Sequence, residues 1–139
     1  MRQALHRLTV ETRGKGLTDI SGLIFDWIAA QRIETGLLTV WCRHTSASLT
    51  VQENADPTVR ADILRFFEAL VPEETGRYAH EDEGPDDMPA HLRTMLTETQ
   101  ISIPVANGRP VFGTWQGLYL FEHRRQPHRR EMVLHLMGE

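Results

Sequence analysis

The chain has 139 residues, of which 40% are hydrophobic and 24% charged, and its formal net charge is −4. These values are typical of one folded domain and argue against disorder. The acidic balance disfavours a nucleic-acid binder, and the single cysteine excludes an internal disulfide. No apolar run approaches the roughly 18 residues of a membrane span or forms a signal peptide. We therefore expect one cytoplasmic domain over residues 1–139, without nucleic acid or membrane partners.

The first third of the chain predicts a strand and an amphipathic helix. Residues 3–13 contain strand-forming residues, and glycines then break the pattern. Thr18 or Asp19 can cap the helix that follows, because a side-chain oxygen there accepts from amides of the first turn. We expect this helical region to end by Gly36. Its apolar residues recur at the three- and four-residue spacing of a buried helix face: Ile20, Leu23, Ile24, Trp27 and Ile28.

Two strands and two helices are expected next. Residues 37–42 are apolar and rich in strand formers, and residues 46–53 alternate apolar with polar side chains. Asp56 and Pro57 mark a helix start, since aspartate is a common cap and proline is favoured at the first helical position. Another helix starts at the end of a loop over residues 73–87, which holds seven acids and one base. The expected core-facing side chains of these helices are Val59, Ile63, Phe66, Phe67, Leu70, Leu92, Met95 and Leu96.

The last third of the chain predicts strands. Residues 101–106 form one, and Asn107-Gly108 after it is a strong signal for a tight turn. Two long strands follow over 114–123 and 131–137, and the segment between them holds four arginines and no acid. The total is about six to eight strands and three helices without regular alternation, so we expect the α+β class.

Several side chains are candidates for chemistry. His44, Thr45 and Ser46 interrupt two strands and can expose an imidazole with hydroxyls, although a simple surface turn explains them equally well. A serine hydrolase is poorly supported, because the GxSxG elbow is missing. Glu53 ends a strand and could point into a site or into solvent. Trp115 is either a core residue or a platform for a ligand.

Two histidines flank the acidic loop. His80 lies within it, and His91 falls in the first turn of the next predicted helix. Two imidazoles with Asp86 or Asp87 suit a divalent cation such as zinc, although the spacing matches no zinc-finger or HExxH pattern. The alternatives are a solvated loop in which Asp87 caps the helix, or an aspartate that orients a histidine. The arginines before residue 131 can bind phosphate, form a solvated hairpin tip or contact another subunit.

Three blocks, HTSASLTVQENADPTVRAD, HEDEGPDDMPAHL and IPVANGRPVFGTWQGLYLFEHRRQPHRR, resemble the YjbQ-like family, also called the secondary thiamine-phosphate synthase family. The resemblance runs from about residue 5 to the end of the chain. It implies an α+β fold with a β-sandwich-like core, a homotrimer, and a cleft near the subunit boundaries. It also implies a divalent metal ion, zinc or magnesium, held by His44, His80 and His91.

The activity that the resemblance implies joins an aminopyrimidine diphosphate to a thiazole phosphate and expels pyrophosphate. Departure of pyrophosphate requires positive charge from a metal, from arginine or from both. We therefore expect a metal-dependent enzyme that acts on a small phosphorylated metabolite, with Glu53, Asp87 and Ser46 as catalytic candidates. A non-catalytic trimeric protein that binds a metal or anion, and a metal-dependent hydrolase, are the alternatives. The candidate residues for phosphate or substrate binding are Thr45, Trp115, Gln116, Arg124, Arg129 and Arg130.

Overall fold

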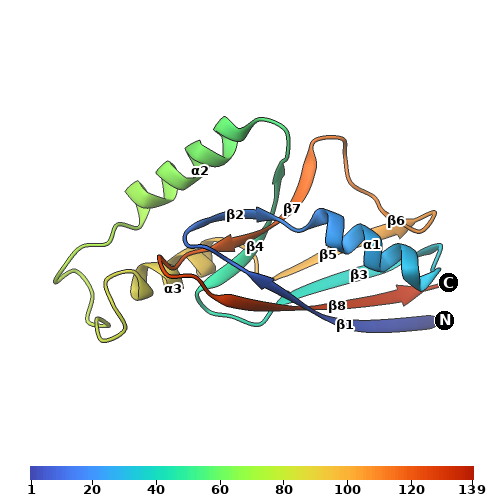
Figure 1. Cartoon of the computed structure of the whole chain (residues 1–139), viewed down its shortest axis with the longest axis horizontal. Helices are drawn as coiled ribbons and strands as arrows, with labels where there is room; N and C mark the ends of the chain where they lie inside the picture. Colours follow the sequence, from blue (N-terminus) through green and yellow to red (C-terminus); the bar gives the residue numbers. More distant parts are fainter.

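Eight strands and three helices make up the computed structural model, which describes all 139 residues (Figure 1). The strands are β1 (Arg2–Glu11), β2 (Gly16–Asp19), β3 (Thr35–Cys42), β4 (Ala47–Glu53), β5 (Gln100–Ala106), β6 (Arg109–Pro110), β7 (Gln116–Glu122) and β8 (Arg129–Gly138), and the helices are α1 (Ser21–Gln31), α2 (Pro57–Leu70) and α3 (Asp87–Leu96). One antiparallel sheet has the order β1-β8-β3-β5-β6, and the other has the order β2-β7-β4. The predicted α+β class and element count are confirmed.

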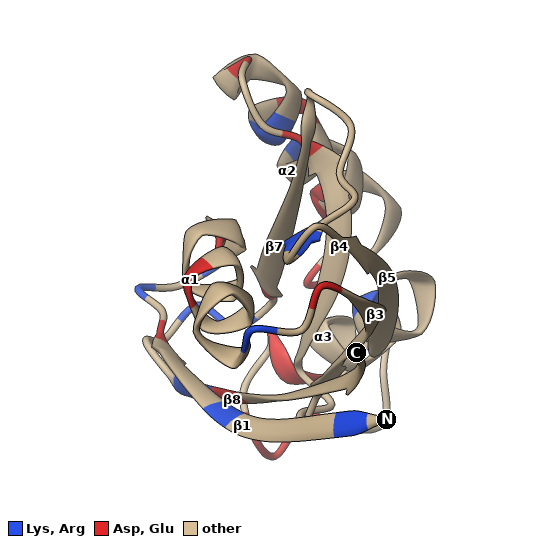
Figure 2. Cartoon of the chain, turned by 90° about the vertical axis from the view of Figure 1, so that its right-hand side faces the viewer, with Lys and Arg blue, Asp and Glu red and all other residues tan.

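One hydrophobic core lies between the two sheets. Along β8, Met132, Leu134 and Leu136 are buried, whereas the residues between them are partly or fully exposed. Leu118 and Leu120 of β7 reach the same core from the other sheet. Burial of one face of a strand produces this alternation, because successive side chains point to opposite faces. Each large apolar side chain removed from water contributes roughly 1.5–3 kcal/mol to the free energy of folding. Figure 2 shows α1 lying across the open side between the sheets.

The start and end of α1 differ from the prediction. The four residues of β2, which no sequence pattern indicated, pair with β7 and lead directly into the helix. The N-cap residue is Ile20, so the prediction that Thr18 or Asp19 caps the helix is wrong, although the carboxylate of Asp19 accepts the amide of Ser21 at 2.9 Å just before it. The helix ends at Gln31, because Arg32 adopts a left-handed conformation (φ 56°) well before Gly36. Of the predicted buried face, Leu23 is 49% exposed, and the fully buried members are Ile20, Ile24 and Ile28.

Helices α2 and α3 do not bury the faces that their spacing predicts. Asp56 caps α2 as expected, but α2 stands away from the sheets (Figure 1) and has no buried residue. It packs through Phe67, whose ring lies edge-on to Phe121 of β7 at 5.3 Å. An apolar stripe identifies a face but does not say what covers it. The predicted core residues that are instead exposed are Phe66 (59%), Leu70 (51%), Met95 (81%) and Leu96 (57%).

Two long connections meet at one end of the molecule. Residues 71–86 join α2 to α3, and residues 123–128 join β7 to β8. The first carries most of the acidic side chains of this region and the second carries basic ones, so ion pairs hold the two together. None of the three helices has both the length and the apolar character needed to cross a membrane.

Candidate metal centre

Four side chains at this end of the molecule form a cluster of metal-type donors. They are His80, Glu83, Asp87 and His91, and one donor atom from each lies within 4.8 Å of all the others. His80 and Glu83 come from the loop before α3, and Asp87 is the first residue of that helix. Residues four apart in a helix share a face, so Asp87 and His91 point the same way. The expected pairing of His80, His91 and Asp87 is therefore seen in the structure, with Glu83 as a fourth member.

Asp87 lies at the centre of the cluster and is buried. Its Oδ2 atom lies 2.7 Å from Nε2 of His80 and 3.0 Å from Nε2 of His91. Burial opposes ionisation of this carboxyl, but hydrogen bonds and the nearby positive charges outweigh burial and lower its pKa. The same hydrogen bond from Asp87 raises the pKa of His80. The cluster is therefore an anionic site poised to hold a proton or a cation.

The hydrogen bonds of His91 fix which of its nitrogens is free. Nδ1 lies 2.8 Å from the carbonyl oxygen of Thr45, so this nitrogen carries the proton that it donates. In a neutral ring, Nε2 then has a lone pair, and that lone pair faces Oδ2 of Asp87 at 3.0 Å. Two acceptors at this distance require a proton or a cation between them. Metal-binding histidines commonly donate their second N–H to a carbonyl in this way, so the residues fit a metal.

His44, which the family resemblance placed with the other two histidines, lies outside this cluster. Its Nε2 accepts the amide of Glu131 at 2.7 Å, and its Nδ1 lies 3.4 Å from Nη1 of Arg130. Burial and the neighbouring charge of Arg130 lower the pKa of His44. Within one chain, Glu83 takes the place among the donors that we expected His44 to occupy.

The predicted phosphate-binding arginines have different surroundings. Arg130 is buried and forms an ion pair with Glu122, and its Nη2 donates to Oγ of Ser46 at 3.0 Å. Ser46 is thereby held by an internal arginine. Arg124 bonds to the acidic loop through all three of its guanidinium nitrogens. Arg124 and Arg130 would have to give up these internal contacts to bind phosphate. Of the three predicted arginines, only Arg129 is exposed and without an ion pair.

Three other candidates lie at the far end of β7. Glu53 of β4 is paired with Gln116, the first residue of β7. The other end of β7, which leads to the cluster, is six residues further along the strand, or about 20 Å away. The carboxylate of Glu53 accepts the amides of Ala55 and Asp56 at 3.0 and 2.8 Å, which shapes the turn before α2. Trp115 is 63% exposed, so the core interpretation is wrong for it. Within one chain, Glu53, Trp115 and Gln116 do not join the histidines.

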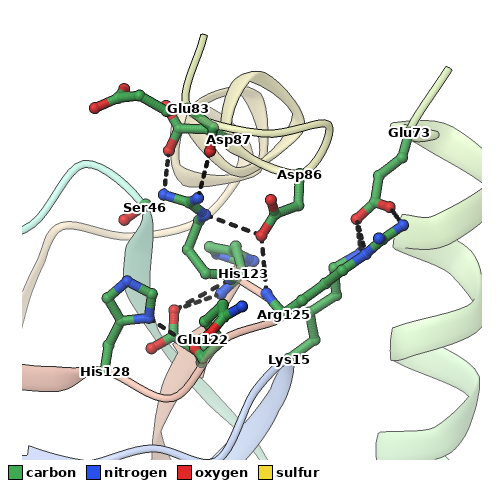
Figure 3. Close-up of polar contacts among 12 residues, drawn as sticks. Lys15, Ser46, Glu73, Glu83, Asp86, Asp87, Glu122, His123, Arg125 and His128 are labelled. Atoms are coloured by element: carbon green, nitrogen blue, oxygen red, sulfur yellow. Dashed lines mark hydrogen bonds and ion pairs between the residues drawn. The ribbon is translucent and has the colours of Figure 1, made fainter. Parts of the chain in front are cut away.

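Two features of this region were not anticipated. Glu83 was one acid among many in the loop, although its position three residues after His80 could have indicated it. Asp86 bonds to Arg124 and to the backbone of Arg125, so the two adjacent aspartates share Arg124, and only Asp87 also contacts the histidines. Figure 3 shows Glu83, Asp86 and Asp87 gathered beside the start of α3, facing the segment that follows β7.

The fold and the cluster define a single-domain α+β protein with a candidate site of two histidines and two carboxylates. The family model described as UPF0047 protein YjbQ-like matches residues 6–139, so the chain belongs to this family.

Relatives and solved structures of the family match almost the whole chain. The chain is 51% identical to UPF0047 protein sll1880 of Synechocystis, over 99% of this chain and 94% of that protein. It is 32% identical to YugU of Bacillus subtilis, over 91% and 93% of the two chains. The crystal structure of a hypothetical protein from Aeropyrum pernix matches with a TM-score of 0.88 at 30% identity, over 98% and 99%. The crystal structure of a yjbq/upf0047 family protein from Clostridium acetobutylicum matches with a TM-score of 0.87 at 31% identity. The match covers 95% of this chain and 99% of that chain.

Proposed function

We propose that the protein is a metal-dependent enzyme acting on a small phosphorylated metabolite, with the cation held by His80, Glu83, Asp87 and His91. The observation that carries the proposal is that Nε2 of His91 lies 3.0 Å from Oδ2 of Asp87 while its Nδ1 is occupied by the carbonyl of Thr45. Two imidazoles and two carboxylates are ligand types of zinc, and a catalytic zinc would take three of them and leave one position for water or substrate. Magnesium prefers oxygen ligands and retains waters, so zinc fits this donor set better.

The cation, when bound, would supply the positive charge that a departing pyrophosphate requires. The protein's own groups have defined tasks around it. The carbonyl of Thr45 holds the proton of His91 on Nδ1 and so keeps Nε2 available. Oδ2 of Asp87 faces both histidines and offsets their charge whenever they are protonated. The specific reaction that we propose is the one the resemblance implies, formation of a thiamine phosphate from an aminopyrimidine diphosphate and a thiazole phosphate.

A non-catalytic metal- or anion-binding protein is the second candidate. It is favoured by the internal contacts of Arg124 and Arg130, which leave few free cations to hold a diphosphate beside the cluster. It is also favoured by the distance along β7 between the cluster and Glu53. The two candidates share the metal site and differ in turnover.

We also propose that the chain assembles as a homotrimer. The outer face of the five-stranded sheet exposes Leu5, Leu37, Trp41 and Met137 at 65%, 47%, 49% and 42%. Leu37 and Met137 are paired across β3 and β8, so part of this surface is a contiguous apolar patch. Patches of this kind mark protein contacts, and closed symmetric rings are common. Light scattering should give about three times 15.9 kDa, and Leu37→Asp should lower that mass, whereas Leu23→Asp on α1 should not.

The metal proposal is tested on protein purified without a polyhistidine tag. Elemental analysis and zinc titration should give one tightly bound zinc per chain, and His91→Ala should abolish it. His6→Ala, which removes an exposed histidine on β1, is the matched control and should bind like the parent. Absence of stoichiometric zinc in the parent would refute the metal site.

The catalytic part of the proposal is tested on the same proteins. The zinc-loaded parent should release pyrophosphate from the two thiamine precursors, and His91→Ala should not. Zinc binding without turnover would favour the binding protein. Turnover that survives in His91→Ala would exclude this site as the source of activity.

A further inference from the structure

Arg124 contacts the segment that carries the metal donors at three points. It lies two residues after the end of β7, and its side chain is 16% exposed. Nε donates to Oδ2 of Asp86 at 2.9 Å, Nη1 to Oδ1 of Asp87 at 2.7 Å, and Nη2 to the carbonyl of Glu83 at 2.8 Å. Every guanidinium nitrogen is therefore bonded to residues 83–87, two of which are members of the donor cluster.

The contact with Asp87 determines which oxygen faces the histidines. A carboxylate is nearly two-fold symmetric and rotates readily about its last torsion when it is free. Here Oδ1 is held by Arg124, so Oδ2 is presented to His80 and His91. The forked shape of a guanidinium suits this task, because the ammonium of lysine lacks its fixed, planar array of donors.

The other two contacts fix the path of the loop. Asp86 also accepts the amide of Arg125 at 2.9 Å, so the loop is bonded to both backbone and side chain of the segment after β7. Gly84 allows this approach. Its φ is +102°, and a Cβ there would lie 3.2 Å from Oδ1 of Asp86. The guanidinium of Arg124 and the amide of Arg125 thus bond residues 83–86 to the segment after β7.

We infer that Arg124 is a positioning residue of the metal centre, which orients Asp87 and the Glu83 loop for a divalent cation. The inference rests on the proposed metal site. Electrostatics alone predicts the opposite effect of Arg124, because a guanidinium beside the site repels a cation. If charge alone mattered, removing Arg124 would tighten zinc binding. If Arg124 positions the donors, removing it weakens zinc binding despite the lost repulsion.

Zinc affinity should be measured by chelator competition for the parent, Arg124→Gln, Arg124→Lys and Arg125→Gln. Arg125 is the matched control, because its side chain is 60% exposed and bonds to Glu73, which is not a metal donor, rather than to residues 83–87. Loss of a residue that orients a metal ligand typically weakens metal binding 10–100-fold. We expect about this loss in both Arg124 variants, whereas Arg125→Gln should bind zinc at least as tightly as the parent.

A spectroscopic measurement separates positioning from general destabilisation. With Co²⁺ as the probe, the visible absorption bands report ligand geometry and should change in the Arg124 variants but not in Arg125→Gln. Circular dichroism checks folding, and if Arg124→Gln does not fold, Arg124→Lys decides. Parent-like or tighter zinc binding in the folded Arg124 variants would overturn this inference alone. A parent that binds no zinc would overturn it together with the proposed metal site.

Discussion

His123 should make the protein lose stability in mild acid. Its side chain is completely buried, its Nε2 lies 2.8 Å from Oγ of Ser48, and its Nδ1 has no partner. Protonation would add an N–H that nothing accepts. Burial, assisted by the charges of Arg93, Arg130 and Lys15, lowers the pKa of His123 to about 3. The native protein therefore excludes a proton that the unfolded chain accepts near pH 6.5.

The sign and size of the effect follow from this difference. Above pH 6.5 neither state is protonated at His123, so the residue adds no pH dependence. Between pH 6.5 and about 3 only the unfolded chain binds the proton, so acid favours unfolding. The slope is about 1.4 kcal/mol per pH unit, which makes a loss of about 3 kcal/mol at pH 4.5. That is a large part of the 5–15 kcal/mol typical of a domain.

Urea unfolding at fixed protein concentration, from pH 7.5 to 4.5, tests this reasoning. His123→Gln replaces the imidazole with a group that does not titrate, so its stability should fall less steeply with acid than that of the parent. The other titrating groups are common to both proteins and cancel in the difference. Ser48→Ala is the control, because it weakens the fold but keeps the imidazole and hence the slope. Equal slopes for the parent and His123→Gln would refute the reasoning.

Three further results are expected. Glu122→Gln leaves the buried guanidinium of Arg130 without its counter-charge and should lower the free energy of unfolding by about 3–5 kcal/mol, measured in urea. Phe67→Ala removes the aromatic contact of α2 with β7 and leaves only polar contacts such as Arg60 with Tyr119, so it should speed amide exchange over residues 57–70, whereas Leu70→Ala should not. Zinc at 100 times its dissociation constant should stabilise the parent by about 2.7 kcal/mol but leave His91→Ala unchanged, as seen by thermal melting.

The sequence predicted part of the candidate site, because His80 and His91 accompany the acidic loop that contains Asp86 and Asp87. The four-residue interval between Asp87 and His91 places them on one helical face, and that pairing is found. The position of His44 could not be predicted in the same way. Its neighbours, Arg130 and Glu131, are more than 80 residues away in the chain, and sheet register brings them to it. Local patterns carry no information about such register.

Charge and hydrophobicity patterns identified segments without saying where the side chains point. The basic segment over residues 124–130 was predicted, but not that Arg124 and Arg130 turn inward toward carboxylates while Arg129 remains exposed. The apolar stripe of α2 correctly indicated a helix. That helix stands off the sheets, so Phe66 and Leu70 remain exposed. Directions and covering surfaces depend on tertiary packing, which no single segment encodes.

The order of strands in the larger sheet has a consequence for how the chain folds. The last strand, β8, lies between β1 and β3, and β1 has no other partner. During synthesis, β1 must therefore remain unpaired until β8 has left the ribosome. An unpaired strand edge can pair with other chains, and closure between distant segments places folding on a slow timescale of milliseconds to seconds. The larger sheet therefore cannot close until β8 has been made, and until then β1 and the β8-facing edge of β3 are open to pairing with other chains.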